Sequence, residues 1–222
     1  TCLTASIGFH VQREIMRSVL RIGTLVGAIF VVLSATPISL WAYAGWLVAL
    51  VATIAGSSRR TAFRYAPLAL LAVVSFIMAA YELPRQKSPQ IDAVGCKVLY
   101  VVGDSLSFGA DPGGQPWPEL LGTKIGLPAR NLSFGGAMLD SALDNAKRID
   151  RDDGLIILEI GGNDLLKGRD DFEENLQIML DTVCRSNRRV VMIELPLPPF
   201  YNSYGLAQRQ LAAKYGVTLI PK

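Results

Sequence analysis

The chain has 222 residues, half of them hydrophobic, and a formal net charge of +3. A charge this small, with the excess arginine placed around apolar runs, excludes the extended basic surface of a nucleic-acid-binding protein. The three cysteines, Cys2, Cys96 and Cys184, form no CxxC pair and no Cys/His cluster, which excludes a disulfide framework and a zinc site. Two alternatives stay open for them: free buried thiols, or one Cys96–Cys184 bridge if that part of the chain lies outside the cytoplasm.

The composition divides the chain into two unlike segments. Residues 1–81 carry six arginines and one glutamate, whereas residues 82–222 carry 16 basic and 18 acidic side chains. The mean hydropathy of +0.32 is high for a soluble domain, and the apolar excess lies in the first third. Residues 1–15 precede Met16, which opens a basic start followed by an apolar run, so we expect them to be upstream, non-native residues.

Three apolar runs, at 19–36, 38–55 and 66–81, dominate the segment 16–83. A membrane-spanning helix needs about 17 to 25 residues. The first two runs meet that length, and the third does so if it extends to Leu83. The sequence therefore predicts three transmembrane helices in contact with the lipid bilayer. A buried soluble helix is the alternative for the third run, and a cleaved signal peptide is the alternative for the first.

The arginines predict an orientation for this segment. They precede the first apolar run and fill the loop between the second and third, at positions Arg13, Arg17, Arg21, Arg59, Arg60 and Arg64. The positive-inside rule makes both of these segments cytoplasmic, together with the N-terminus. The chain from residue 84 onward is then expected outside the cytoplasm, anchored in the cytoplasmic membrane of a bacterium. Residues 84–95, with mixed charge and two prolines, are expected to form a linker.

The segment 96–222 alternates apolar strands with amphipathic helices. Strands are predicted at 97–102, 130–134, 155–160, 190–195 and 217–220, and helices at 117–125, 138–149, 171–184 and 204–215. Continuous apolar strands separated by helices indicate an α/β fold with a parallel sheet covered on both faces. In such sheets the active site lies where the carboxyl ends of the strands meet the loops.

Three polar motifs follow the first three predicted strands: Gly-Asp-Ser-Leu at 103–106, Asn-Leu-Ser-Phe-Gly-Gly at 131–136, and Gly-Gly-Asn-Asp at 161–164. Each alone is ordinary turn chemistry, but the three in order predict a site. A serine such as Ser105 becomes a nucleophile when a base removes its proton. The Gly136 backbone and the Asn163 side chain offer N–H donors for a developing oxyanion, and one such donor contributes about 3 kcal/mol.

This combination resembles the SGNH (GDSL) hydrolase family, and the block LEIGGNDLL is similar to that of bacterial thioesterase/lysophospholipase members. The resemblance implies a flavodoxin-like three-layer sandwich with five parallel strands, and hydrolysis of esters or thioesters without metal or cofactor. It makes Ser105 the nucleophile and assigns the oxyanion hole to the Ser105 and Gly136 amides and the Asn163 side chain. The supporting residues would be Gly103, Asp104, Gly162 and Asp164.

The family pattern is incomplete in this sequence. The resemblance places an Asp-x-x-His block after the fifth strand, but the chain stops at Lys222, and its only histidine, His10, precedes the first apolar run. We therefore expect the domain 96–222 to be truncated at its C-terminus, to lack its general base and to be inactive as it stands. The sequence does not support an α/β-hydrolase, because it lacks the G-x-S-x-G motif of the nucleophile elbow.

The sequence leaves three functions open. The first is a membrane-anchored serine esterase outside the cytoplasm that acts on acyl esters of lipids, thioesters or O-acetylated glycans. The second is an O-acyltransferase on envelope glycans, and the third is a non-catalytic glycan-binding module. An acidic cluster resembles a metal site but opens a predicted helix, where carboxylates complement the helix dipole; it comprises Asp170, Asp171, Glu173 and Glu174.

Overall fold

The computed structural model describes residues 36, 37, 39–56, 65–109, 114–185, 187–198 and 200–222, together with the isolated positions 18, 22, 26 and 29. The chain forms two compact units. The first comprises residues 1–83 with 198–200, and the second comprises residues 84–197 with 201–222. The second unit carries all three polar motifs.

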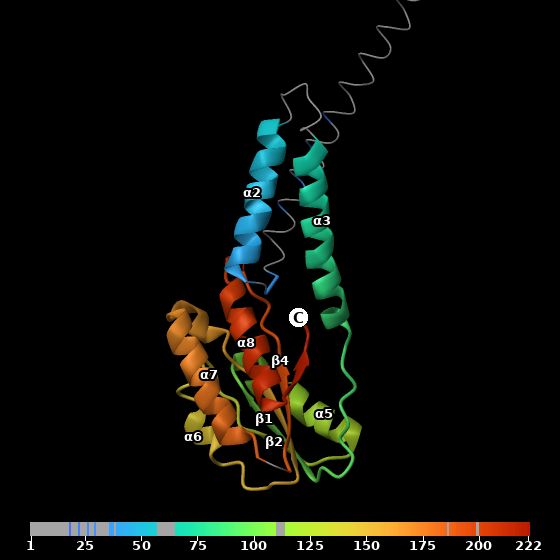
Figure 1. Ribbon diagram of the computed structural model, residues 1–222. Helices are drawn as coiled ribbons and strands as arrows, with labels where there is room; N and C mark the ends of the chain where they lie inside the picture. The colour runs from blue at the N-terminus through green and yellow to red at the C-terminus, as the bar shows by residue number, and fades with distance from the viewer. Residues whose placement is uncertain are drawn as a thin grey trace, which may run out of the picture. The chain divides into compact units, whose positions relative to one another are not determined.

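In the first unit, helices α2 (Leu40–Gly56) and α3 (Tyr65–Glu82) lie side by side (Figure 1). They pack through a small apolar cluster formed by Trp46, Ala49, Leu50 and Leu71. The Trp46 indole N–H donates to Ser75 Oγ at 3.2 Å, which satisfies its one polar group. A short 3₁₀ helix, η2 (Leu83–Gln86), follows α3.

The expectation of transmembrane spans is not confirmed for these two helices. They form where the second and third apolar runs were predicted, but within the described residues no helix combines the length and hydropathy needed to cross a membrane. Most of the first run, 19–36, lies outside the described residues, as do residues 1–15 and the arginine loop.

The second unit is built on a five-stranded parallel sheet with the order β2-β1-β3-β4-β5. The strands are β1 (Val98–Gly103), β2 (Ala129–Asn131), β3 (Gly154–Glu159), β4 (Arg189–Ile193) and β5 (Thr218–Ile220). All of β1 and nearly all of β3 is buried, as continuous apolar strands predict for a sheet covered on both faces. The predicted parallel sheet, with the flavodoxin-like strand order, is confirmed.

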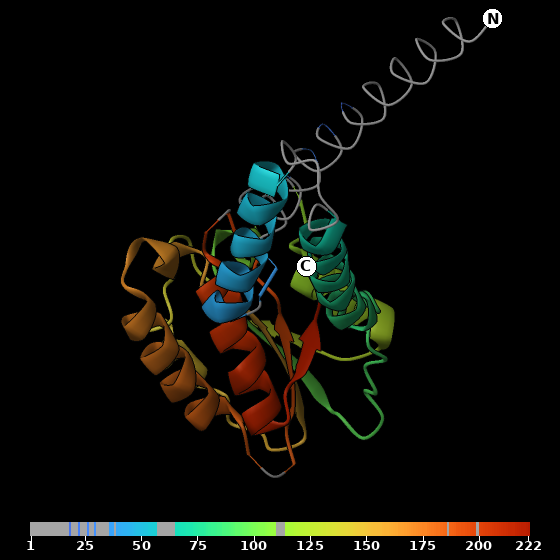
Figure 2. The same cartoon turned by 45° about the horizontal axis from the view of Figure 1, so that its top comes forward.

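Helices cover both faces of this sheet (Figures 1 and 2). Helix α5 (Trp117–Ile125) packs on one face, where a core cluster gathers around Leu99, Val101 and Ile157. Helices α7 (Arg169–Val183) and α8 (Asn202–Tyr215) pack against each other through an edge-to-face contact of Phe172 and Tyr204, whose ring centroids are 5.1 Å apart. Three one-turn helices complete the unit: α4 (Ser105–Phe108), α6 (Leu143–Ala146) and η3 (Asn163–Leu166).

Two details differ from the sequence-based expectation. The helix predicted at 138–149 is reduced to α6, because the Met138 and Leu139 amides donate to the side chains of Ser141 and Asp164 in a turn. Cys96 and Cys184 are both free thiols, so the alternative of a bridge between them is wrong in this structure. Burial raises the pKa of Cys184 to about 11, which keeps its thiol protonated at neutral pH.

Candidate active site

The three polar motifs meet at the carboxyl edge of the sheet. They follow β2, β1 and β3, which are neighbours in the sheet, so the three loops lie side by side. Gly103 at the end of β1 pairs in register with Glu159 at the end of β3. This placement brings together the predicted segments 103–106, 131–136 and 161–164.

Ser105 is the first residue of α4, the single helical turn after β1. Asp104 caps this turn: its Oδ1 accepts from the Leu106 N–H at 2.9 Å, and its carbonyl accepts from the Phe108 N–H at 2.9 Å. Ser105 is exposed, whereas Asp104 is buried. The turn therefore presents the Ser105 side chain to solvent and keeps its capping residue below the surface.

Gly103 lets this turn pack closely on the sheet. A Cβ at Gly103 would lie 2.6 Å from Ser107 Oγ and 2.9 Å from the Glu159 carbonyl oxygen. Any other residue would push α4 away from the ends of β1 and β3. The supporting role predicted for Gly103 thus has a steric basis in this structure.

Asn131, at the end of β2, connects the Ser105 turn to the second loop. Its Nδ2 donates to the Ser107 carbonyl at 2.7 Å, and its Oδ1 accepts from the Ser133 N–H at 3.1 Å. Sequence reasoning used the motif 131–136 only to select Gly136 and missed this connection. The signal was present, because a polar amide at the end of a strand in a parallel sheet points to the site edge.

Gly136 is exposed and has a φ of +73°. A Cβ at this position would meet no protein atom within 4 Å, so packing does not require glycine here. Glycine suits the position because its backbone adopts the left-handed conformation without strain. That conformation sets the direction of the amide N–H at residue 136.

Asn163 opens the 3₁₀ turn η3 on the third loop. Its Nδ2 donates to the Ala137 carbonyl at 2.9 Å and more weakly to Asp104 Oδ2 at 3.4 Å. Gly162 precedes it, and a Cβ there would lie 3.6 Å from that same Asp104 Oδ2. The Asn163 amide therefore links the third loop to both of the others.

Asp164 fixes the third loop to the second from below. It is fully buried, and its two carboxylate oxygens accept from the Leu139 N–H at 3.2 and 3.1 Å. Burial raises the pKa of this carboxyl, while the Leu139 hydrogen bond and the charge of Lys167 oppose that rise. The predicted supporting residue Asp164 is thus a structural tie rather than a group exposed to a substrate.

Glu159 is a residue of this edge that sequence reasoning missed. Its Oε2 accepts from Ser107 Oγ at 2.6 Å, directly beneath the Ser105 turn. Burial raises its pKa, the Ser107 hydrogen bond lowers it, and the Asp104 charge raises it further. A lone acidic residue at the end of the apolar strand LIILE was the signal that could have identified it.

Residues 101–221 match the model of the GDSL-like lipase/acylhydrolase family. The chain belongs to this family. Among solved structures, it is similar to TesA with 26% identity over 55% of this chain and 77% of that chain, at a TM-score of 0.46. The SGNH-hydrolase family esterase AlinE4 matches with 24% identity over 59% and 77%, at a TM-score of 0.48.

A third solved structure is the psychrotrophic esterase EstA from Pseudoalteromonas sp., inhibited by monoethylphosphonate. It matches with 22% identity over 57% of this chain and 77% of that chain, at a TM-score of 0.47. No curated protein matches the chain. Family membership supports an ester hydrolase, as the resemblance of the three motifs predicted.

The GDSL-like domain offers no metal site within the part of the chain that the structure describes, where no three His, Cys, Asp or Glu side chains cluster suitably. The acidic residues at the start of α7 face other partners: Glu173 pairs with Arg169 at 2.6 Å, one helical turn away. His10, the one histidine of the sequence, lies outside the described residues. The Asp-x-x-His block therefore stays a prediction about sequence that these residues do not contain.

Proposed function

We propose that this GDSL-like domain is a serine ester hydrolase with Ser105 as its nucleophile. The observation that carries the proposal is the arrangement of the three loops. Ser105 is exposed on a turn that Asn131 ties to the loop of Gly136, and Asp104 Oδ2 of the same turn lies 3.4 Å from Asn163 Nδ2. A nucleophile held between two loops with N–H donors suits acyl transfer through a tetrahedral intermediate.

In the proposed reaction, Ser105 Oγ forms a bond to the carbonyl carbon of the ester while its proton passes to a general base. The carbonyl oxygen becomes an oxyanion, for which the Ser105 and Gly136 backbone amides and the Asn163 side chain are the proposed donors. Collapse of the intermediate releases the alcohol or thiol, and water then hydrolyses the acyl-serine. The resemblance assigns the base to a histidine of an Asp-x-x-His block.

The contacts of Asn163 support its part in this proposal. Of its two amide hydrogens, one is held by the Ala137 carbonyl at 2.9 Å, and the other makes only the long 3.4 Å contact with Asp104. The long contact is weak, so an oxyanion can replace Asp104 as the acceptor of this second N–H at little cost. The strong bond to Ala137 meanwhile keeps the amide plane in place.

The surroundings of Ser105 favour an apolar acyl chain over an acetyl group on a glycan. Leu106, next to Ser105, is 73% exposed, and Leu166, at the end of the turn that Asn163 opens, is 90% exposed. Phe108 on α4 is also exposed. Covering such side chains contributes about 1.5–3 kcal/mol each. An acyl chain can cover them, whereas a polar sugar gains little there.

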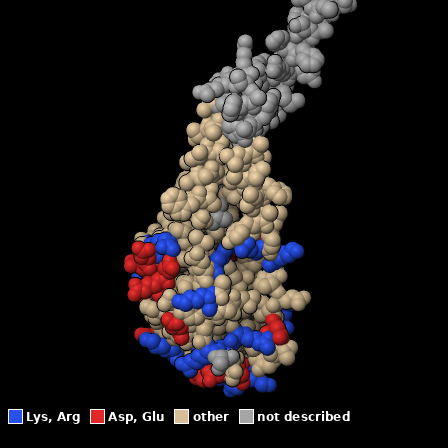
Figure 3. Space-filling view, in the orientation of Figure 1, with Lys and Arg blue, Asp and Glu red and all other residues tan. Residues whose placement is uncertain are grey.

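We further propose that the N-terminal segment attaches the enzyme to a lipid bilayer. Between Leu40 and Tyr81 the helices α2 and α3 contain no charged residue, and Figure 3 shows none on their visible face. Large apolar side chains are exposed along both helices: Leu40, Trp41, Leu47, Val48, Val51, Ile54, Leu70, Val73, Phe76 and Ile77. The arginine distribution supports placing the hydrolase domain outside the cytoplasm.

A phosphonate label tests the nucleophile directly. The full-length natural protein, incubated with a fluorophosphonate probe and digested, should carry the adduct on the peptide that contains Ser105, as mass spectrometry would show. A label on another residue, or no label together with no hydrolysis of p-nitrophenyl butyrate, would remove the serine-esterase proposal. Hydrolysis of the acetate ester that is far faster than that of the butyrate or octanoate would contradict the preference for an apolar acyl chain.

The membrane proposal has its own test. The full-length protein with an alkaline phosphatase fused after its last residue should sediment with membranes and be active in intact bacterial cells. A carbonate wash should leave it in the membrane fraction, because apolar rather than ionic contacts hold it. Recovery in the soluble fraction would overturn membrane attachment, and phosphatase activity only after lysis would overturn the extracytoplasmic placement.

A further inference from the structure

Ser107, two residues after the proposed nucleophile, is fully buried and is bound at each of its polar groups. Its N–H donates to the Asp104 carbonyl at 3.2 Å, and its carbonyl accepts from Asn131 Nδ2 at 2.7 Å. Its hydroxyl donates to Glu159 Oε2 at 2.6 Å. The last two of these bonds tie the turn that carries Ser105 to the ends of β2 and β3.

A glutamate at position 159, opposite Ser107, carries a cost in desolvation. It ends β3, where its backbone carbonyl also accepts from the Asp104 N–H at 3.2 Å. Its side chain is half-buried, and the Asp104 carboxylate carries a like charge nearby. Packing alone would be served better by an apolar residue, because a buried carboxylate loses hydration and gains only one hydroxyl donor.

The geometry of this contact explains what the carboxylate adds. A carboxylate acceptor makes a short, directional bond, and 2.6 Å is typical of an O–H group donating to an ionised oxygen. With Gly103 leaving space for it, Ser107 is drawn against the ends of both β1 and β3. A one-turn helix has few internal bonds of its own, so this external bond fixes how far α4 stands from the sheet.

We propose that Glu159 and Ser107 form a positioning pair that sets the location of Ser105 Oγ for attack. The inference rests on the proposed function and deepens it, because neither residue touches the substrate. Both act through α4. A nucleophile displaced by about 1 Å can lose on the order of 10²-fold in rate. Losing the pair should thus lower kcat with a smaller effect on KM, since Leu106 and Phe108 move with α4 but stay exposed to the acyl chain.

The test uses the full-length protein in a Glu159→Gln background. The glutamine oxygen still accepts the Ser107 hydrogen bond but more weakly than a carboxylate, so kcat should fall by no more than about 3-fold. Adding Ser107→Ala then removes that bond without leaving a buried charge unpaired. The double variant should lose roughly 10- to 100-fold in kcat, with KM within about 2-fold, on p-nitrophenyl butyrate.

A matched control is Thr182→Ala in the same Glu159→Gln background. Thr182 also donates its hydroxyl to a single acceptor, the Ile178 carbonyl at 2.8 Å, but on α7 away from the Ser105 turn. It should leave kcat unchanged. If Glu159→Gln with Ser107→Ala keeps the kcat of Glu159→Gln alone, or if KM rises while kcat holds, the positioning pair is overturned.

A second measurement separates this inference from the proposed function. The Phe108 amide donates to the Asp104 carbonyl within α4, so its hydrogen exchange reports how firmly the turn is held. In the double variant this amide should exchange at least about 10-fold faster than in Glu159→Gln, relative to amides in β1. Unchanged exchange overturns the pair whether or not the protein hydrolyses esters. A wild-type protein without ester hydrolysis overturns the proposed function instead.

Discussion

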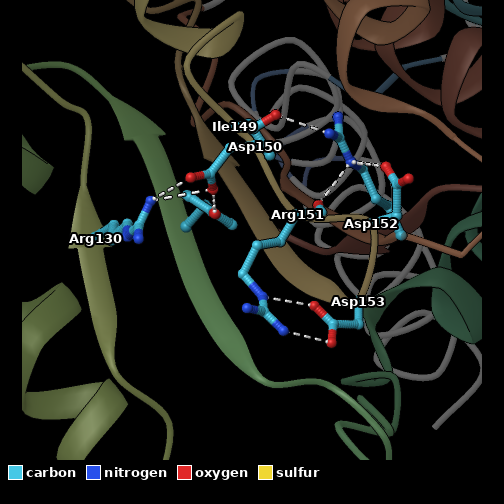
Figure 4. Close-up of polar contacts among 8 residues, drawn as sticks. Arg130, Ile149, Asp150, Arg151, Asp152 and Asp153 are labelled. Carbon is cyan, nitrogen blue, oxygen red and sulfur yellow. Dashed lines mark hydrogen bonds and ion pairs between the residues drawn. The ribbon is translucent and has the colours of Figure 1, made fainter.

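The two ends of the parallel sheet are both polar, but they are held together by opposite chemistry. At the amino end, before β3 and β4, arginines carry the contacts (Figure 4). Arg188, with a side chain only 1% exposed, donates to the Ile149 and Arg151 carbonyls at 2.8 and 3.1 Å. Arg151 binds Asp153 with two hydrogen bonds of 2.8 Å each.

At the carboxyl end, the carboxylates beneath Ser105 accept from neutral donors, whereas Glu194, directly after β4, pairs with Arg209 at 2.5 Å. Asp104 accepts from Leu106, Asp164 from Leu139, and Glu159 from Ser107. The pKa shifts follow this difference. Burial raises the pKa values of Glu159 and Asp164, whereas the arginine Arg151 lowers the pKa of Asp153 through its hydrogen bonds. Cation pairing closes the amino end, while the three carboxylates beneath the exposed serine are bound by neutral donors.

The largest effect should come from the exposed serine itself. Ser105→Ala in the full-length protein should lower ester hydrolysis by about 10³-fold or more, because the nucleophile is lost. The melting temperature should stay near that of wild type, since Ser105 makes no buried contact that holds the sheet edge. Thr123→Ala, which removes an exposed hydroxyl on α5, is the control and should keep full activity. Substantial activity in Ser105→Ala would separate this edge from catalysis.

Asn163→Ala should have the next largest effect, lowering kcat by about 10²-fold or more through loss of an oxyanion donor. Asn163→Asp tests the donor role more directly, because it keeps the size of the side chain but replaces the N–H donors with a negative charge. It should be at least as inactive, since its carboxylate would repel both the oxyanion and Asp104. Steady-state kinetics on p-nitrophenyl esters would decide. An active Asn163→Asp variant would contradict the role as a donor.

Arg188→Met should instead act on stability, because the amino end has no part in the proposed reaction. It leaves buried carbonyls, including that of Ile149, without a donor, and we expect a loss of about 2–3 kcal/mol in the free energy of unfolding. Urea titration of the variant and of Arg185→Met, whose side chain is 62% exposed, measures the difference. Activity per folded molecule should not change. A loss of kcat in folded Arg188→Met would contradict the assignment of stability to the amino end and of the reaction to the carboxyl end.

The sheet could be predicted from the sequence because its strands are continuous apolar runs separated by amphipathic helices. The three loops that make up the site edge could be predicted for the same reason, since strand order brings their carboxyl ends together. Local pattern also identified the positions Ser105, Gly136 and Asn163. Their roles in catalysis stay predictions until the variants above are measured.

What the sequence could not give were contacts between side chains far apart in the chain. Ser107 and Glu159 are 52 residues apart and meet only because β1 and β3 pair in register. The tie between Asp164 and Leu139 likewise replaces the start of a predicted helix with a turn. The second and third apolar runs predicted the helices α2 and α3, but the hydropathy of a run does not set where a helix ends, so the observed ends differ from the predicted ones by one or two residues.

The smallest expected effect is a pH-dependent change in stability, which tests the opposite pKa shifts of the carboxyl groups at the two ends. The native state holds the Glu159 proton to a higher pH than the unfolded chain does, because its pKa is raised by burial. Between these two pKa values the folded protein binds more protons, so the free energy of unfolding falls as pH rises. Glu159→Gln removes that fall. Its stability relative to wild type should therefore improve as pH increases from about 4 to 7.

Asp153→Asn should show the opposite trend. The lowered pKa of Asp153 gives a stabilisation that is present above the unfolded pKa and is lost as pH falls through the folded pKa. Relative to wild type, this variant should become less stable as pH rises, by a small amount because the Arg151 pair is partly exposed. Urea unfolding at several pH values measures both variants. Trends of the same sign would mean that the two ends are held by the same electrostatics after all.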